Sequence, residues 1–252
     1  QHHTDIKEII DSSSDKIKTL VETLTRHRNS GGDFRQQKYE RPYSEAYLSY
    51  FFPQNTCKLQ IVLLELLKYS ELPSTLNVVD LGIGTGTSFI ALLDFLWLLS
   101  EICELYSIEW PIETVSLTGI EESAANCEVT RDMLSTYREL LVQFCDSNVQ
   151  PILIEAIDKA EIEQAAFRIS SNKLKAYDLV IISNTFNELD KDSRNKLKDE
   201  LVSLEEKAHC ILIEPGDQQN SLELNRFKRE LINDSAGQLQ AIAPCGEGLH
   251  SQ

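Results

Sequence analysis

The stretch that decides the fold is "NVVDLGIGTGTSFIAL", residues 77–92. An apolar run ends in Asp80, and glycines then follow at every second position, at Gly82, Gly84 and Gly86. This order predicts a buried strand, a turn with few side chains and then an apolar helix. In a parallel sheet, ligands collect where strands end and helices begin, because the helix amino terminus is electropositive and offers backbone N–H groups. The sequence therefore predicts a ligand site in this turn.

The chain on either side of this turn alternates short apolar runs with amphipathic helices. Such alternation is typical of a mostly parallel sheet with helices on both faces, so we expect an α/β, Rossmann-like fold. Strands are expected at residues 77–81, 114–120, 150–157, 177–183, 209–214 and 238–244, and helices at 87–105, 123–145, 158–169, 190–207 and 221–233.

The residues before the first strand are expected to be helical. Residues 5–27 have helical spacing, and two further helices are predicted at 44–52 and 56–69, separated by Pro53. We therefore expect an N-terminal helical region over residues 1–72 and a Rossmann-like domain over residues 73–252. Just one candidate strand remains after Gly237, which suggests a shortened C-terminal hairpin.

Composition and charge limit the classes of function. A net charge of −16 argues against sequence-independent adhesion to nucleic acid over the whole surface. The six cysteines form no C-x-x-C pair, so we expect a reducing compartment and no metal site. The longest apolar stretch, residues 88–105, contains Asp94 and Glu101 and is read as a buried helix rather than a membrane span. We expect a cytoplasmic protein without membrane contact, or one of the mitochondrial matrix in a eukaryote.

The glycine turn resembles the first motif of class I S-adenosylmethionine-dependent methyltransferases, in which a hydrophobic residue and Asp precede alternating glycines. A dinucleotide fingerprint needs G-x-G-x-x-G, but Thr87 stands at the last position, which disfavours a nicotinamide or flavin cofactor. The resemblance implies the class I methyltransferase fold and S-adenosylmethionine as cofactor. It also implies that the three glycines admit the methionine moiety against bare backbone and that Asp80 helps to orient it.

Two acidic residues are candidates for the nucleoside part of this cofactor. Glu121 ends the second strand, where a carboxylate can accept both ribose hydroxyls; otherwise it is a solvated carboxylate that complements the helix dipole. Asp158 is expected at a helix start after the third strand, either near the adenine amine or as a plain N-cap.

The ends of the fourth and fifth strands are expected to face the methyl acceptor. Asn184 is a further cofactor candidate, and Asn187, Glu188 and Glu214 are candidates for the substrate side. The Asn-Pro-Pro-aromatic signature of amino-group methylases is missing, so neither the acceptor nor a catalytic residue is readable. Methyl transfer from a sulfonium depends on alignment and desolvation, so a missing Ser-His-Asp set does not exclude an enzyme.

Four stretches together resemble one branch, the small-ribosomal-subunit-associated methyltransferase-like family of mitochondria and bacteria: residues 43–67, 177–197, 210–231 and 242–245. The resemblance implies a methyltransferase that acts on ribosomal RNA or in maturation of the small subunit. The small ribosomal subunit or its RNA is then the expected partner, and no DNA partner is expected. Family members carry further cysteines associated with an iron–sulfur cluster, but only Cys245 matches here, so no cluster is inferred.

Other functions stay open at this point. A non-catalytic assembly factor that retains the cofactor pocket would explain the missing acceptor motif, and a methyltransferase of a small molecule or protein would suit the charge better. A nucleotide-linked oxidoreductase ranks last. A local basic patch either follows RNA phosphates or is a solvated helix end; it comprises Arg26, Arg28, Arg35, Lys38 and Arg41.

Overall fold

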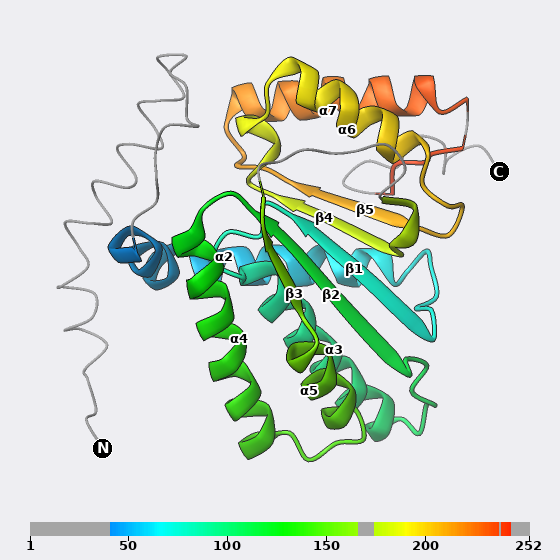
Figure 1. The fold of residues 1–252 in the computed structure, drawn as a ribbon. Helices are drawn as coiled ribbons and strands as arrows, with labels where there is room; N and C mark the ends of the chain where they lie inside the picture. Colours follow the sequence, from blue (N-terminus) through cyan, green and yellow to red (C-terminus); the bar gives the residue numbers. More distant parts are fainter. Residues whose placement is uncertain (1–40, 166–173, 237, 243–252) are drawn as a thin grey trace.

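The computed structural model describes residues 41–165, 174–236 and 238–242, which form a five-stranded parallel sheet between two helical layers (Figure 1). The strand order is β3-β2-β1-β4-β5, so strands are added on opposite sides of β1, which creates a topological switch point between β1 and β4. The expected α/β, Rossmann-like fold is confirmed. The strands are β1 Thr75–Leu81, β2 Thr114–Glu121, β3 Glu161–Gln164, β4 Leu179–Ser183 and β5 His209–Ile213.

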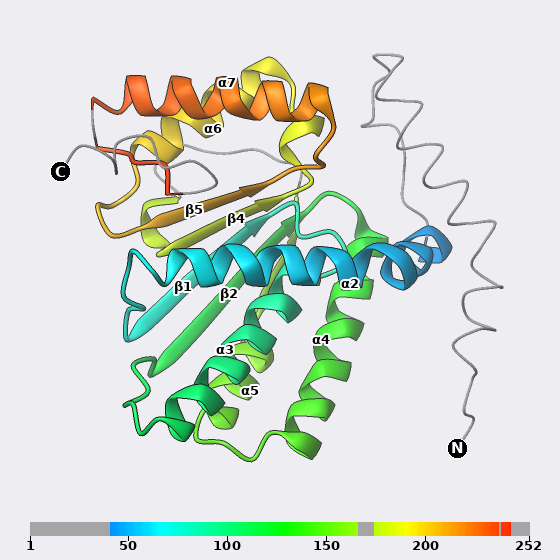
Figure 2. The same cartoon turned by 180° about the vertical axis from the view of Figure 1, so that it is seen from behind.

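Helices cover the two faces of the sheet unequally, as Figures 1 and 2 show from opposite sides. Successive strand residues point to opposite faces, so Val78 belongs to the core beneath four helices and Val79 to the core beneath two. The first layer holds α2 Arg41–Leu66, α3 Thr87–Leu105, α4 Ala124–Phe144 and α5 Gln150–Asp158, and the second holds α6 Lys191–Val202 and α7 Gln218–Asp234.

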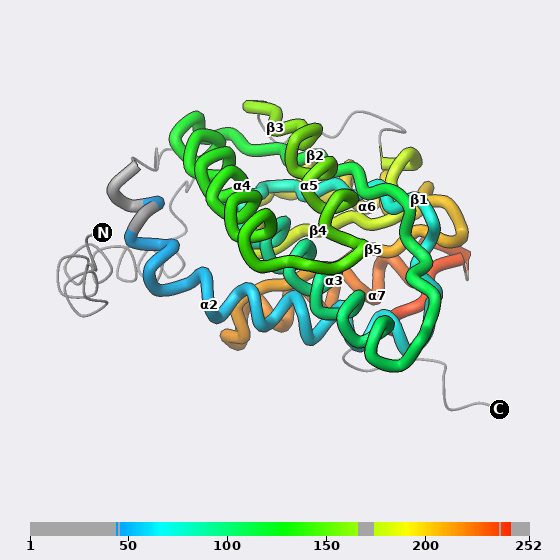
Figure 3. The backbone as a smooth tube through the Cα atoms, turned by 90° about the horizontal axis from the view of Figure 1, so that it is seen from below, coloured from blue at the N-terminus to red at the C-terminus, as the bar shows by residue number. Residues whose placement is uncertain are grey.

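Helix α2 replaces the two helices that were expected on either side of Pro53. It runs unbroken through that proline, as the continuous tube in Figure 3 shows. A proline inside a helix costs about 3 kcal/mol because it removes a hydrogen bond and crowds the preceding turn. Leu59 and Leu63 offset this cost, since both are buried in the same core as α3 and the sheet. The division at residue 72 stays a prediction, because residues 1–40, with the expected helix at 5–27, lie outside the described part.

The expected strand at residues 150–157 is wrong, because this stretch is helix α5. Pro151 lies in its first turn, where a fixed φ favours a helix and the missing N–H has no partner to lose. Leu153, Ala156 and Ile157 then form a buried helical face. The third strand is the short edge strand β3, so the helix expected at 158–169 is also absent from its described residues.

The end of the described chain also differs from the expectation. Residues 238–242 form no strand, and the remainder of the strand expected at 238–244 lies outside the described residues. The C-terminal hairpin therefore stays a prediction. Within the described ranges, every helix is too short or too polar to cross a membrane.

Candidate functional site

The glycine turn joins β1 to α3 and has left-handed backbone at all three glycines, with φ of +84° at Gly82, +58° at Gly84 and +82° at Gly86. A Cβ at Gly82 would lie 2.2 Å from Thr185 Oγ1, and one at Gly86 would lie 3.0 Å from Thr130 Cγ2. A Cβ at Gly84 would have its nearest described neighbour only at 4.0 Å. Close packing within the chain therefore requires two of the glycines, and Gly84 is the one that leaves open space for a ligand.

Hydrogen bonds tie this turn to the neighbouring β2–α4 segment. The Thr130 hydroxyl donates to the Gly84 carbonyl at 2.8 Å, and the Gly84 N–H donates to Glu121 Oε2 at 2.9 Å. The N–H groups of Gly82 and Ile83 both donate to the Ile120 carbonyl, at 2.8 and 3.1 Å. The open space over Gly84 thus has a fixed floor, so a ligand would not have to order the loop.

Glu121 lies at the end of β2, beside the turn. Its Oε1 accepts from the Ser123 N–H at 2.8 Å, while Oε2 accepts from Gly84. Burial raises the pKa of Glu121, and the backbone donors at Ser123 and Gly84 oppose that rise. Each carboxylate oxygen can accept a second hydrogen bond, so Glu121 can hold the turn and still receive hydroxyl groups from a ligand.

Asp80 ends the apolar run of β1 and is fully buried. Neither carboxylate oxygen has a hydrogen-bond partner among the described residues. Burial raises the pKa of Asp80 to about 7; the nearby Ser88 hydroxyl lowers it and the charge of Glu121 raises it further. Ser88 lies close enough to favour the ionised form, but its hydroxyl does not reach hydrogen-bond geometry. A buried carboxylate without a donor is costly, and a cation or donor brought by a ligand would relieve that cost.

The end of β4 lies across the switch point from this turn. Asn184 has a left-handed φ of +58°, and its N–H donates to the Ile213 carbonyl at 2.7 Å. Thr185 Oγ1 lies 3.3 Å from the Gly82 carbonyl and 3.2 Å from that of Ser183, so the β4 end is packed onto the glycine turn. The structure therefore brings Asn184 to the same edge of the sheet as Asp80 and Glu121.

The substrate-side candidates gather around the short helix η3 Phe186–Glu188, which follows β4. Glu214 Oε1 accepts from the Phe186 N–H at 2.8 Å, so this carboxylate fixes the turn. Asn187 Oδ1 is buried and has no hydrogen-bond partner within the described ranges. Glu188 is exposed at the end of η3. These three residues surround one turn, and Glu214 has a structural role there whatever it does to a substrate.

Tyr47 of α2 is a site residue that sequence reasoning missed. Its hydroxyl accepts from Asn55 Nδ2 at 2.8 Å. Burial raises the pKa of Tyr47 to about 12; the Asn55 hydrogen bond lowers it, and the negative charges of Glu188 and Asp80 raise it further. The phenol therefore lies near carboxylates from both β1 and η3. The signal that could have identified Tyr47 is its position within residues 43–67, one of the four stretches that resemble the family.

Asp158 is not brought to the site in the way that was expected. It ends α5 rather than starting a helix, and its exposed carboxylate pairs with Arg138 at 2.6 Å. That guanidinium lowers the pKa of Asp158. Gln164 ends β3 instead, at the edge of the sheet where the nucleoside ligand was expected. The expected helix start at Asp158 is therefore wrong, and its place near an adenine stays an untested prediction.

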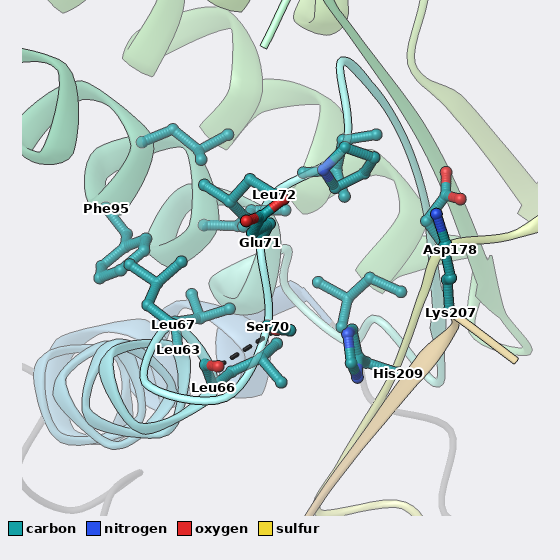
Figure 4. A pocket seen from close by; sticks show the side chains of 15 residues that line it. Leu63, Leu66, Leu67, Ser70, Glu71, Leu72, Phe95, Asp178, Lys207 and His209 are labelled. Carbon is teal, nitrogen blue, oxygen red and sulfur yellow. Dashed lines mark hydrogen bonds between the residues drawn. The ribbon is translucent and has the colours of Figure 1, made fainter. Parts of the chain in front are cut away.

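A cavity lies at the opposite, amino-terminal edge of the sheet, as Figure 4 shows from close by. Leu63, Leu92 and Phe95 line it together with Asp178 and His209. Its volume of about 30 Å³ is room for a very few water molecules, so it cannot hold a cofactor. Among the described residues no three His, Cys, Asp or Glu side chains are grouped to hold a metal ion.

The sequence pattern of a known family, described as mitochondrial small ribosomal subunit Rsm22, matches residues 41–251. This chain belongs to the Rsm22 family. The match covers the glycine turn, Glu121 and η3, so the candidate site of this Rsm22-family chain lies inside the matched region. No curated protein matches the chain significantly.

Solved structures similar to this Rsm22-family chain are distant. A putative S-adenosyl-L-methionine-dependent methyltransferase from Methanococcus maripaludis is 11% identical, over 79% of this chain and 74% of its own, with a TM-score of 0.46. The methyltransferase domain of bacterial CtHen1 is 14% identical, over 74% and 87%, with a TM-score of 0.48. The chain spans about half of two others, 53% of the glycopeptide N-methyltransferase MtfA, complexed with S-adenosylmethionine, and 55% of the mitomycin 7-O-methyltransferase MmcR.

Proposed function

We propose that this chain binds S-adenosylmethionine over Gly84 and transfers its methyl group to ribosomal RNA, or acts with it in maturation of the small ribosomal subunit. The observation that carries the proposal is Asp80, a fully buried carboxylate without a hydrogen-bond partner among the described residues, next to a turn with open space at one glycine. The cofactor carries a sulfonium and an ammonium group, and such cations favour the ionised form of a nearby carboxylate.

The residues at this edge fit the parts of that cofactor. Gly84 allows a ligand to approach the backbone, Asp80 supplies negative charge, and Glu121 has spare acceptor capacity for ribose hydroxyls. When bound, the cofactor supplies an electrophilic methyl group. The chain's own task is then to hold the acceptor in line and to exclude water.

The acceptor side is proposed to lie between η3 and α2. Asn187, Glu188 and Tyr47 offer polar groups there, and Asn184 lies just before η3, after the end of β4. The description of the Rsm22 family supports the small ribosomal subunit as the setting and favours the mitochondrial matrix over the cytoplasm. The net charge of −16 requires that any contact with RNA be local.

A second candidate is an assembly factor that binds the cofactor without transferring its methyl group. One observation favours it: both oxygens of Glu121 already accept from backbone N–H groups, which is a structural role in its own right. The assembly factor would use the same cofactor site, so only a test of methyl transfer distinguishes it from the enzyme.

Titration calorimetry with S-adenosylmethionine tests the site on the full chain. The Gly84→Ala variant places a methyl group in the open space, and we expect the affinity to fall by about tenfold or more, the range that loss of one good contact produces. Glu121→Gln should weaken binding similarly, whereas Glu122→Gln, at an exposed neighbour, should not. Unchanged affinity in both site variants, with folding verified by circular dichroism, would refute the assignment.

Incubation with purified small subunits and methyl-labelled cofactor tests the reaction. Label on the RNA supports the enzyme. Tight cofactor binding with no label on RNA or on any component of a cell extract supports the assembly factor.

A further inference from the structure

The carboxyl-terminal half of α3 and the turn after it expose a row of large apolar side chains, which we call the α3 end patch. Leu98, Ile102 and Leu105 follow each other at helical spacing and share one stripe of α3, and Tyr106 and Ile108 continue the row. Leu105 is 77% exposed and Tyr106 is 70% exposed. A row of this kind on one surface indicates an interaction site, whereas single exposed apolar residues need no explanation.

The patch has a fixed backbone. The Ile108 N–H donates to the Cys103 carbonyl at 2.8 Å, and the Tyr106 N–H donates to the Ile102 carbonyl at 3.1 Å. Ser107 between them adopts a left-handed φ of +54°. Because the turn is closed by these bonds and anchored by the buried Cys103, a partner would meet a surface that is already formed.

The patch is remote from the proposed cofactor site. Helix α3 begins at the glycine turn and has 19 residues, which corresponds to a length of about 28 Å. The patch lies at the far end of that length, toward the amino edge of the sheet (Figure 1). A ligand over Gly84 therefore cannot cover it.

The charged residues in this part of the sequence are all acidic. The exposed carboxylates of Glu101, Glu104, Glu109 and Glu113 lie in or next to the patch, and none makes an ion pair within the described residues. No lysine or arginine occurs anywhere from residue 69 to residue 130. The surface therefore combines apolar area with uncompensated negative charge.

We propose that the α3 end patch docks a basic amphipathic segment of another protein, with apolar side chains on one face and lysine or arginine beside them. The carboxylates would repel the phosphates of an RNA. In a symmetric contact between two copies, the same patch would face itself, and the carboxylates would oppose each other. A basic amphipathic partner buries the apolar row and also pairs the carboxylates. The proposal stands apart from the proposed methyltransferase activity.

Two synthetic helical peptides of equal length test the proposed docking. Both have the same leucine pattern, but all polar positions are lysine in one peptide and glutamate in the other. Fluorescence anisotropy with the full chain should show the lysine peptide binding about tenfold more tightly or better, with an affinity that falls as salt rises. Leu105→Ser combined with Ile108→Ser should weaken it about tenfold, and Glu104→Lys combined with Glu109→Lys should weaken it and flatten the salt dependence. Leu222→Ser, at a leucine that is 59% exposed on α7, and Glu206→Lys are the controls and should change nothing.

Several results would overturn the proposal. One is equal binding of both peptides or no binding of the lysine peptide, and another is an equal loss in the control variants. A chain that sediments as a dimer and becomes monomeric with Leu105→Ser would assign the patch to a second copy. Competition between the lysine peptide and a short RNA would assign it to nucleic acid.

Discussion

At the carboxyl edge of the sheet, Asp80 is buried beside three left-handed glycines, without a hydrogen-bond partner among the described residues. At the amino edge, Leu63, Leu92 and Phe95 line a cavity of about 30 Å³. The first edge contains a buried charge and open space, both of which reduce stability unless a ligand uses them. The second edge is packed mainly by apolar side chains, which increases stability, and its cavity is too small for a cofactor. The difference indicates that the carboxyl edge, rather than the cavity at the amino edge, has the charge and the room for a small ligand.

The largest expected effect concerns Asp80. Its folded pKa of about 7 exceeds the ordinary 3.8, so the folded state binds the proton more tightly than the unfolded state. The resulting stability is fully present below pH 3.8 and is lost as the pH rises to about 7, by up to roughly 4 kcal/mol. Asp80→Asn cannot ionise, so its free energy of unfolding should depend less on pH across this range, as urea denaturation at several pH values would measure.

The same variant should weaken binding of S-adenosylmethionine, because the negative charge is lost. Asp158→Asn is the matched control: this carboxylate is exposed and its pKa is lowered by Arg138, so its small effect has the opposite sign. An unchanged pH slope in Asp80→Asn would mean that the buried carboxylate does not titrate as inferred.

The second effect concerns the close approach of the two strand ends. Gly82→Ala introduces a Cβ 2.2 Å from Thr185 Oγ1 at a φ of +84°, so we expect the free energy of unfolding to fall by about 3 kcal/mol. Gly216→Ala, where a Cβ meets nothing within 4 Å, should cost far less. Combining Gly82→Ala with Thr185→Gly should restore the part due to the clash. If both single glycine variants are equally stable, the contact between the β1 and β4 ends is not tight.

Much of the fold could be predicted from the sequence because four of the five strands have a clear apolar or alternating pattern. The expected strands at 77–81, 114–120, 177–183 and 209–214 agree with the structure within two residues at each end. The prediction for residues 150–157 was wrong because a short apolar run fits a buried strand and a buried helix equally well. Pro151 was the signal that favoured the helix. The true β3, "EIEQ", is a polar edge strand and so lacks a hydrophobic pattern.

The candidate site, like the fold, could be predicted from the sequence only in part. Asp80, the glycines and Glu121 come together because adjacent parallel strands end at one edge, a rule that sequence order alone can apply. Tyr47 could not be placed, since its helix precedes the sheet in sequence and its position depends on packing against α3 and α4. One contact that fixes this packing joins the buried Ser44 hydroxyl to Asn126 Oδ1 at 2.7 Å. Such tertiary contacts have no periodic pattern from which they could be read.

The smallest expected effect is on stability, at two residues with left-handed backbone, one at the carboxyl edge and one at the amino edge of the sheet. Asn184 has φ of +58° after β4, and Ser107 has φ of +54° after α3. Glycine relieves backbone strain but loses more entropy on folding, so Ser107→Gly should stabilise the chain by about 0.5 kcal/mol. Asn184→Gly should change stability less, because asparagine tolerates this conformation.

Affinity for the cofactor should distinguish Asn184 from Ser107 more clearly than stability does. Loss of the Asn184 side chain should reduce the affinity for S-adenosylmethionine by about fivefold, the scale of one exchanged hydrogen bond, while Ser107→Gly should leave it unchanged. The measurement is the same calorimetric titration, made beside a thermal melt of each variant. Equal affinities in both variants would mean that Asn184 serves only the turn between β4 and η3, and the cofactor site would then rest on the β1 and β2 ends alone.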